Sequence, residues 1–369
     1  MKRKIRAVSA LLLTMVMIFA IPLSVGAKKP AELIVAGIPF GIKFHTEGVI
    51  VAGLPNEKGP AAEAGIKRGD VITAIDSEPI SSAEKFAEII KNSGGKTMTL
   101  EYRSGALSHS AQVTPTVDES GEYKLGIWVK DSAAGIGTIT FIDPETMSFA
   151  GLGHGICDGA GGEPLPLSFG SAEEVSLTGI VIGKAGAPGE LRGSFAGHKI
   201  GKILKNDLTG VYGMLSEMPE ELEKEKYPIC KSSEIKEGKA YIFATVDGEG
   251  RKRYEIEIFD IVKDGKDKNF SVRITDEALL AKTGGIVQGM SGSPIIQDGK
   301  LIGAVTHVMI SDPTARYGIF IENMLAAADG ELRQTAIEKA PRGVPFRLCH
   351  ARLTEQKSSR NWRSCSEGV

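Results

Sequence analysis

Apolar residues recur with two different spacings in the first third of the chain, and together they predict a small α/β module over residues 33–118. Short apolar runs bounded by turn residues predict strands at 33–44, 48–54, 71–75, 98–103 and 108–115, the first interrupted by a turn at 37–41. Ala83, Phe86, Ala87 and Ile90 fall at i, i+3, i+4 and i+7, which predicts a helix with one apolar face. Ser81 and Glu84 have the spacing of a capping box, so the helix is predicted to begin at Ser81.

The region from about residue 119 to residue 330 predicts mainly short β-strands, with a solvated helix or loop at the charge-dense stretch 217–226. Residues 254–262 alternate between apolar and polar, turn at 263–266 and return through 270–275, which predicts a hairpin. Residues 294–296 and 301–308, joined by an Asp298–Gly299 turn, predict a second hairpin. Short strands separated by glycine turns are typical of a barrel or sandwich, and the 45 glycines among 369 residues favour that interpretation.

The two ends of the chain predict segments outside these domains. Lys2, Arg3, Lys4 and Arg6 precede an apolar run from Ala7 to about Val25, so residues 1–27 are predicted to be a signal peptide or a membrane anchor. Residues 331–369 are rich in basic side chains and show no sustained periodicity, so we expect a disordered basic tail.

Composition excludes several classes of function. A net charge of −2 gives no overall attraction to nucleic acid, so we expect no nucleic-acid partner. The four cysteines have irregular spacing, and no Cys/His cluster has zinc-ligand spacing. We therefore expect no metal and no cofactor.

The strongest candidate for chemistry is the stretch from Gly284 to Ile295, in which Ser291 is flanked by Gly289 and Gly292 and followed by Pro294. Small neighbours allow a tight turn that exposes a serine hydroxyl as a nucleophile. The backbone N–H groups of Gly289 and Ser291 are the predicted oxyanion-hole donors.

A nucleophilic serine needs a general base and a group that orients the base. Three histidines of the β region are candidates for the base: His154, His198 and His307. His154 is favoured because the surrounding glycines would leave its ring uncovered, whereas His307 lies in an apolar strand. The residues alone do not separate the possible acids, which are Asp158, Asp207, Asp247, Asp260 and Asp276.

The α/β module resembles a PDZ domain. Residues 61–72 (AAEAGIKRGDVI) are similar to the helix and Gly-Asp–strand signature of that family. The resemblance implies that Gly37, Ile38, Pro39, Phe40, Gly41 and Ile42 form the carboxylate-binding loop. Such a module binds a peptide as an added strand, so it would bind a partner protein or another copy of the chain.

The glycine-framed His154, the Ile-Thr-Asp at 274–276 and the serine motif, behind an N-terminal PDZ module and membrane segment, resemble the stage IV sporulation protein B peptidases of family S55. That resemblance covers the chain to about Asn323 and assigns His154, Asp276 and Ser291 as the catalytic triad. The implied fold is mainly β, with a PDZ domain followed by a trypsin-like double-barrel peptidase domain.

The resemblance also implies a biological role. The protein would be a serine endopeptidase exported across the forespore membrane into the space between forespore and mother cell. There it would cleave itself and a membrane-bound regulatory subunit of an intramembrane protease, which triggers sigma-factor processing. Two alternatives remain, a catalytically weak PDZ-bearing signalling adaptor and a general exported quality-control protease.

Overall fold

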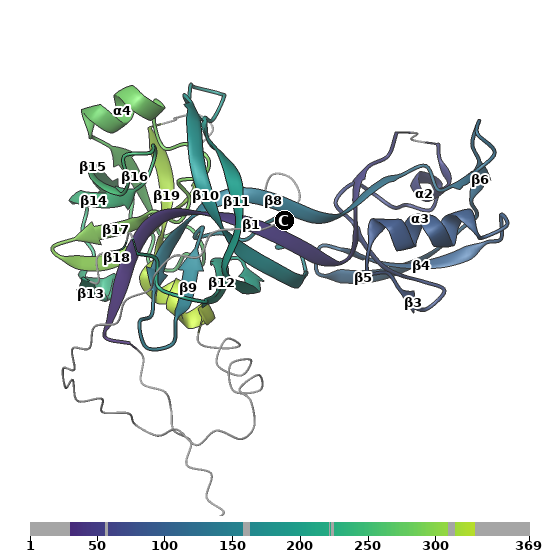
Figure 1. Ribbon diagram of the computed structural model, residues 1–369, viewed down its shortest axis with the longest axis horizontal. Helices are drawn as coiled ribbons and strands as arrows, with labels where there is room; N and C mark the ends of the chain where they lie inside the picture. Colours follow the sequence, from purple (N-terminus) through teal and green to yellow (C-terminus); the bar gives the residue numbers. More distant parts are fainter. Residues whose placement is uncertain are drawn as a thin grey trace, which may run out of the picture.

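In the computed structural model, which describes residues 30–55, 58–157, 163–220, 222, 225–308 and 314–328, two lobes are joined by a pair of long strands (Figure 1). These strands are β1 (Glu32–Gly53) and β8 (Trp128–Ile142), and they pair antiparallel over most of their length. The residues between them in sequence build the smaller lobe, and the residues after them build most of the larger lobe.

The smaller lobe combines a sheet with two short helices. Strands β2 (Val71–Ile75), β4 (Met98–Ser104) and β5 (Leu107–Val113) extend the sheet from the end of β1. Helix α3 (Ala83–Lys91) buries Phe86 and Ile90 against them. The remaining elements of this lobe are α2 (Pro60–Glu63), β3 (Glu78–Pro79), β6 (Thr116–Val117) and β7 (Tyr123–Lys124).

The predicted α3 is present, and its N-cap is Ser82, one residue after the predicted N-cap Ser81. Ser82 is its N-cap, because the Ser82 hydroxyl accepts a hydrogen bond from the Lys85 N–H at 3.1 Å. Glu84 then lies in the first turn, where its charge favours the helix dipole.

Six strands of the larger lobe close a first barrel. In order around the ring these are β1, β8, β9 (Ser148–Gly151), β12 (Gly210–Leu215), β11 (Glu190–Asp207) and β10 (Leu167–Val181), and β10 pairs with β1 to complete it. Alternate residues of β1, including Ile38, Phe40 and Ile42, point into its core.

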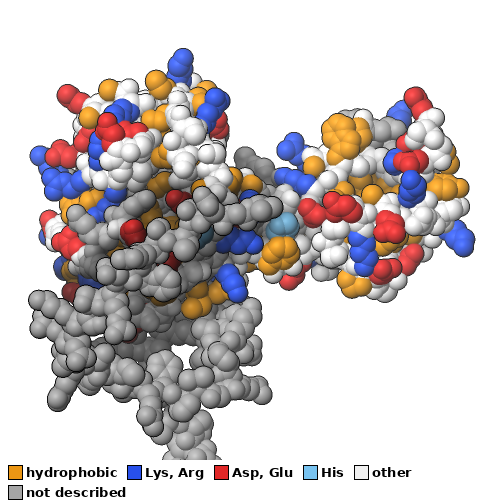
Figure 2. Space-filling model, viewed as in Figure 1, with side chains coloured by type: hydrophobic (Ala, Val, Ile, Leu, Met, Phe, Trp, Pro, Cys, Tyr) orange, Lys and Arg blue, Asp and Glu red, His pale blue; other side chains and the backbone are white. Residues whose placement is uncertain are grey.

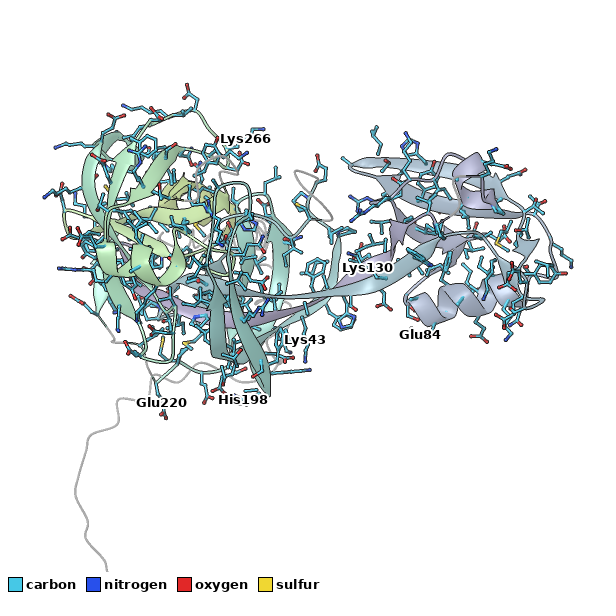
Figure 3. The ribbon with its side chains drawn as sticks, turned by 90° about the horizontal axis from the view of Figure 1, so that it is seen from above. Lys43, Glu84, Lys130, His198, Glu220 and Lys266 are labelled. Carbon is cyan, nitrogen blue, oxygen red and sulfur yellow. The ribbon has the colours of Figure 1, made fainter. Side chains whose placement is uncertain are left out.

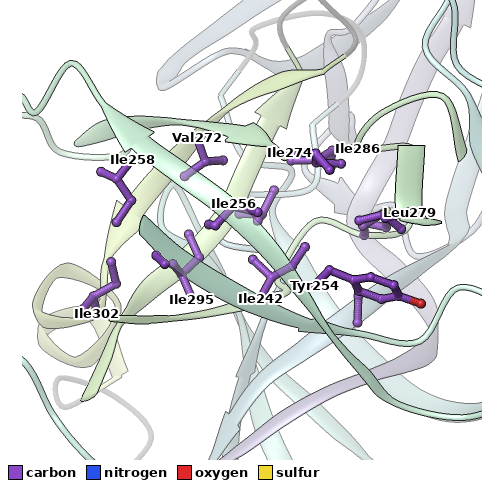
Figure 4. Packing of buried hydrophobic residues seen from close by; sticks show 14 of the residues in the cluster. Ile242, Tyr254, Ile256, Ile258, Val272, Ile274, Leu279, Ile286, Ile295 and Ile302 are labelled. Atoms are coloured by element: carbon purple, nitrogen blue, oxygen red, sulfur yellow. The ribbon is translucent and has the colours of Figure 1, made fainter. Parts of the chain in front are cut away.

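A second closed barrel follows in sequence. Its strands are, in spatial order, β14 (Gly238–Ala244), β15 (Lys252–Phe259), β16 (Phe270–Ile274), β19 (Ala315–Phe320), β18 (Lys300–Val308) and β17 (Pro294–Gln297). Isoleucine side chains dominate its interior, among them Ile242, Ile256 and Ile295 (Figure 4). The predicted hairpins β15–β16 and β17–β18 both form.

Short elements complete the larger lobe. They are β13 (Lys226–Pro228), the 3₁₀ turn at Ser232–Glu234, α4 (Glu277–Thr283) and a final helix over residues 321–328. The fold is therefore mainly β, with two barrels in the arrangement expected for a trypsin-like peptidase.

The order of elements corrects the predicted start of the PDZ module at residue 33. Residues 33–46 of β1 pair with β8 and β10, so they belong to the first barrel. The α/β lobe begins only where β1 leaves that barrel.

Candidate active site

Ser291 lies in a tight turn immediately before β17, where the two barrels meet. Gly289 and Gly292 on either side of it both have φ of +96°, a conformation that glycine adopts without strain. A β-carbon added at Gly292 would lie 2.0 Å from the carbonyl oxygen of Thr138, so no other residue fits there. The Ser291 side chain is half-buried, and its hydroxyl donates to the Thr306 carbonyl at 3.2 Å.

The backbone of this turn presents two N–H groups that have no acceptor. Within the part of the chain that the structure describes, neither the Gly289 N–H nor the Ser291 N–H makes a hydrogen bond, although Gly289 is buried. Buried N–H groups are almost always paired, so two unpaired ones beside a serine hydroxyl mark a place prepared for an oxygen of a ligand. This is the arrangement that the predicted oxyanion hole requires.

Strand β8 of the first barrel holds the serine turn from the opposite side. The Thr138 hydroxyl donates to the Gly289 carbonyl at 2.7 Å, and the Thr138 N–H donates to the Ser291 carbonyl at 3.0 Å. The Thr140 hydroxyl donates to the Gly292 carbonyl at 2.7 Å. Both threonine side chains are buried, so these bonds fix the turn against the first barrel.

His154 follows β9 and reaches the same region. Two consecutive left-handed residues, Leu152 at φ +66° and Gly153 at φ +67°, turn the chain just before it. A β-carbon added at Gly153 would lie 3.2 Å from the Val305 carbonyl oxygen and 3.4 Å from Cβ of Thr306, the residue that accepts the Ser291 hydroxyl. The Gly292 N–H donates to the Val305 carbonyl at 2.8 Å, so the His154 segment and the serine turn meet the same two residues of β18.

The hydrogen bond to Gly155 determines which nitrogen of the His154 ring carries the proton. Nδ1 lies 2.9 Å from the Gly155 carbonyl oxygen, and because a carbonyl can only accept, Nδ1 carries the proton. Nε2 is then the unprotonated nitrogen, the form a general base needs. Burial lowers the pKa of His154 below its ordinary 6.5, and the hydrogen bond to Gly155 only partly offsets this.

Sequence reasoning missed Asn206, which anchors the loop after His154. Its Oδ1 accepts from the Ile156 N–H at 2.8 Å, and its Nδ2 donates to the carbonyls of Ile156 at 2.9 Å and Leu165 at 3.0 Å. The Asn206 side chain therefore supplies the hydrogen bonds that a neighbouring strand would otherwise give to the backbone of Ile156 and Leu165. Asn206 lies between Lys205 and Asp207 in a polar run at the end of β11, so nothing in the sequence indicated this role.

The other candidate histidines are placed differently. His198 lies on the outside of the larger lobe, more than half exposed, with Nδ1 3.7 Å from Oε2 of Glu174 (Figure 3). The backbone of His307 is in β18, and its side chain lies outside the described residues. The described backbone therefore brings two candidate histidines toward Ser291: His154, through Gly153 beside Val305 and Thr306, and His307, which directly follows Thr306.

Asp276 is the N-cap of α4 in the second barrel. Its Oδ1 accepts from the Leu279 N–H at 2.9 Å, and its Oδ2 accepts weakly from the Glu255 N–H at 3.4 Å. These bonds give the carboxylate a structural task, so the role of Asp276 as the acid of the triad stays a prediction.

The other candidate acids have varied settings. Asp207 lies at the β11–β12 turn, with its backbone carbonyl against Gly155 of the His154 loop. Burial acts to raise the pKa of Asp207, but hydrogen bonds from Thr209 and the charge of Lys205 outweigh it and lower the pKa overall. Asp247 pairs with Lys282, Asp260 has φ of +51° just after β15, and Asp158 lies outside the described residues.

The predicted carboxylate-binding loop at Gly37–Ile42 is wrong. These residues lie inside β1, where Gly41 pairs with Ile136 of β8 on one side and with Glu173 of β10 on the other. Ile38, Phe40 and Ile42 are buried in the first barrel. Gly41 and Ile42 are paired on both edges, and the side chains of this stretch fill the core of the first barrel, so it is not a loop beside α3.

The strand beside α3 is instead the beginning of β8. The Ala83 N–H of α3 donates to Oδ2 of Asp131 at 3.0 Å, and Leu125 is buried with Phe86 and Ile90. Gly126, at φ +75°, turns the chain between β7 and β8. In the described residues, the edge of β8 opposite β1 has no strand partner from Trp128 to Ser132.

Other predictions concern metals and the ends of the chain. Among the residues described, no cluster of His, Cys, Asp or Glu is arranged to hold a metal ion, and no helix combines the length and apolar character needed to cross a membrane. The predicted N-terminal segment 1–27 and the basic tail 331–369 lie outside those residues.

Comparisons with known proteins match both lobes. The family described as SpoIVB peptidase S55 matches residues 121–325, more than half of the chain, and the PDZ domain family matches residues 53–104.

Individual relatives match shorter parts. A probable periplasmic serine protease of the do/HhoA-like type from Haemophilus influenzae is 38% identical over 66 residues, which are 18% of this chain and 14% of that protein. The chain spans less than a third of the length of each curated relative it matches.

Two solved structures are similar to parts of the chain. The PDZ domain of the SdrC-like protein from Listeria monocytogenes is 30% identical, with a TM-score of 0.21, and covers 22% of this chain and 87% of its own. The inactive form of Rv3671c from M. tuberculosis is 13% identical, with a TM-score of 0.28, and covers 56% of this chain and 83% of its own.

Proposed function

Because the chain belongs to the SpoIVB peptidase family S55 and is a serine peptidase with a PDZ domain, we propose that it is an exported endopeptidase of sporulation signalling with Ser291 as nucleophile and His154 as general base. The proposal rests above all on the two unpaired N–H groups of Gly289 and Ser291 beside the Ser291 hydroxyl.

The proposed reaction is the one that a serine and a histidine base perform in serine peptidases. Nε2 of His154 takes the proton from the Ser291 hydroxyl while Oγ attacks the carbonyl carbon of the scissile peptide bond. The oxygen of that carbonyl becomes negative and accepts hydrogen bonds from the N–H groups of Gly289 and Ser291, each donor stabilising the transition state by about 3 kcal/mol. His154 then gives its proton to the leaving amine, and water hydrolyses the acyl-enzyme by the same steps.

Substrate recognition is proposed for the free edge of β8 beside α3. An extended peptide can add there as a further strand, because among the described residues no strand pairs with that edge next to α3. The partners proposed from the family are a second copy of this chain and a membrane-bound regulator of an intramembrane protease. Slower hydrogen exchange of residues 127–132 in Ser291→Ala, on adding peptides released by the wild type, is the expected sign of such binding.

The test of the catalytic assignment is intact-mass analysis of purified residues 28–369, wild type beside Ser291→Ala. Discrete fragments are expected from the wild type only, since the substitution removes the nucleophile and disturbs little packing at a half-buried position. Identical fragments from both proteins would refute Ser291 as the nucleophile. If both stay intact, labelling with a fluorophosphonate distinguishes a competent serine from a binding-only adaptor.

A further inference from the structure

The hairpin formed by β10 and β11 reaches from the first barrel to the chain that leads into Ser291. Near its tip, the Gly183 N–H donates to the Thr283 carbonyl at 2.8 Å. Gln288 is bonded on both of its backbone groups: its N–H donates to the Gly189 carbonyl at 2.7 Å, and its carbonyl accepts from the Leu191 N–H at 2.8 Å. The hairpin tip thus pairs with the segment three residues before the serine.

These bonds set the orientation of one particular peptide group. In a trans peptide the C=O and the following N–H point in opposite directions. Because the Gln288 carbonyl points to Leu191, the Gly289 N–H points away from the hairpin, and it is one of the two N–H groups left without an acceptor. If the Gln288–Gly289 peptide were turned over, its carbonyl oxygen would take the place of the donor and repel an oxyanion.

We propose that the tip of the β10–β11 hairpin is the positioning element of the oxyanion hole, acting through the bond from the Leu191 N–H to the Gln288 carbonyl. The inference rests on the proposed role of Ser291 and Gly289 and extends it to residues that touch no substrate. The hairpin holds the peptide group in its competent orientation before substrate binds, so the reaction needs no reorganisation there.

Packing leaves little freedom at this contact. A β-carbon added at Gly189 would lie 2.1 Å from the Val181 carbonyl oxygen and 2.5 Å from the Gly183 nitrogen. A β-carbon added at Gly289 would lie 3.0 Å from Cβ of Leu191, which is itself buried. The side chain of Gln288 is exposed, so the backbone of this residue, rather than its side chain, carries the contact.

Gly189→Ala tests the proposal, because the added methyl group would clash with Val181 and Gly183 within the hairpin and would lie 2.8 Å from Cγ1 of Val287, so the tip cannot keep its place beside Gln288. Gly179→Ala is the matched control on the same hairpin, where an added β-carbon meets nothing within 4 Å. The measured quantity is the second-order rate constant for labelling of Ser291 by a fluorophosphonate, whose P=O oxygen occupies the oxyanion hole. We expect Gly189→Ala to lower this rate constant by about 10²–10³-fold on the high-pH plateau of its pH profile, the usual loss for one oxyanion donor. The acid midpoint of the profile should stay unchanged. Gly179→Ala should label at the same rate as the wild type.

A folded Gly189→Ala protein that labels within about twofold of the wild type would overturn the proposal, since a lost donor costs far more. Failure of the catalytic assignment looks different, because the wild type would then not label at Ser291 at all. If Gly189→Ala does not fold, hydrogen exchange of the wild type decides. Strong protection of the Leu191 amide supports the proposal, and exchange as fast as that of an unstructured amide refutes it.

Discussion

At the scale of single residues, the site depends on backbone conformations that side chains cannot reveal. Leu152 is a non-glycine residue in the left-handed region, which costs of the order of 1 kcal/mol and persists only where the surroundings enforce it. Here it directs the chain so that Gly153 meets β18 just before His154. The glycines around Ser291 and His154 made both residues recognisable in the sequence, whereas Leu152 carried no such signal.

The lowered pKa of His154 predicts how activity depends on pH. The base must be neutral, so activity is lost as the pH falls through the pKa of the folded protein, and burial places that pKa below 6.5. The His154 ring has a lower pKa in the folded protein than in the unfolded chain, so the unfolded chain binds a proton first as the pH falls. The stability of the fold is therefore unaffected by His154 above the unfolded pKa and decreases as the pH falls below it. The fluorophosphonate labelling rate should have its acid midpoint below 6.5, and a midpoint above that value would contradict the burial argument.

Asp276 has two competing roles that one substitution separates. Because the Asp276 carboxylate caps α4, we expect Asp276→Asn, whose amide oxygen can still accept from Leu279, to keep its stability and to lose far less than the roughly 10⁴-fold that removal of a triad acid costs. Labelling rates and thermal unfolding measure the two effects. A loss near that size with unchanged stability would make Asp276 the acid that the family resemblance assigns.

At the scale of elements, patterns with a regular period were predictable and irregular ones were not. The β15–β16 and β17–β18 hairpins follow from alternation and from the Asp298–Gly299 turn. The strand at 37–42 was misjudged because Gly37, Pro39 and Gly41 resemble a turn, although Ile38, Phe40 and Ile42 alternate as in a strand. The contact between the β10–β11 hairpin and Gln288 is made by backbone groups, so it could not be predicted from the side chains in the sequence.

The hydrogen bonds of the half-buried Asn206 amide predict an effect on stability and on the labelling rate. Asn206→Ala removes three hydrogen bonds and leaves partly buried backbone groups unpaired, so we expect a stability loss of about 1–3 kcal/mol and a lower labelling rate, because the loop after His154 loosens. Asn92→Ala at the exposed end of α3 is the matched control. Thermal unfolding and labelling kinetics test both variants, and an Asn206→Ala protein as active and stable as the control would show that the amide does not hold the loop.

At the scale of the whole molecule, one strand runs from the edge proposed for peptide binding to the serine turn. The start of β8 lies beside α3, its middle crosses between the lobes, and Thr138 and Thr140 near its end hold the serine turn (Figure 1). Acidic and basic side chains are mixed over the surface of the smaller lobe, which gives no single-sign patch in this view and fits a partner recognised through its backbone (Figure 2). The two-barrel fold was predictable from the motifs, whereas the shared strand was not, since pairing partners are set by tertiary contacts.

The way β1 and β8 enclose the α/β lobe makes that lobe an insertion in a hairpin of the first barrel. His45 of β1 and Ser132 of β8 are direct cross-strand partners, so the two cut ends would lie as close as any paired residues in a sheet. Excising residues 46–131 and joining the ends with a two-residue Asn-Gly turn should therefore leave the six-stranded ring closed. We expect the shortened enzyme to unfold cooperatively and to label with fluorophosphonate at Ser291. Because the lobe is inserted between two paired residues, evolution could replace it with another domain while the two-barrel body keeps its fold.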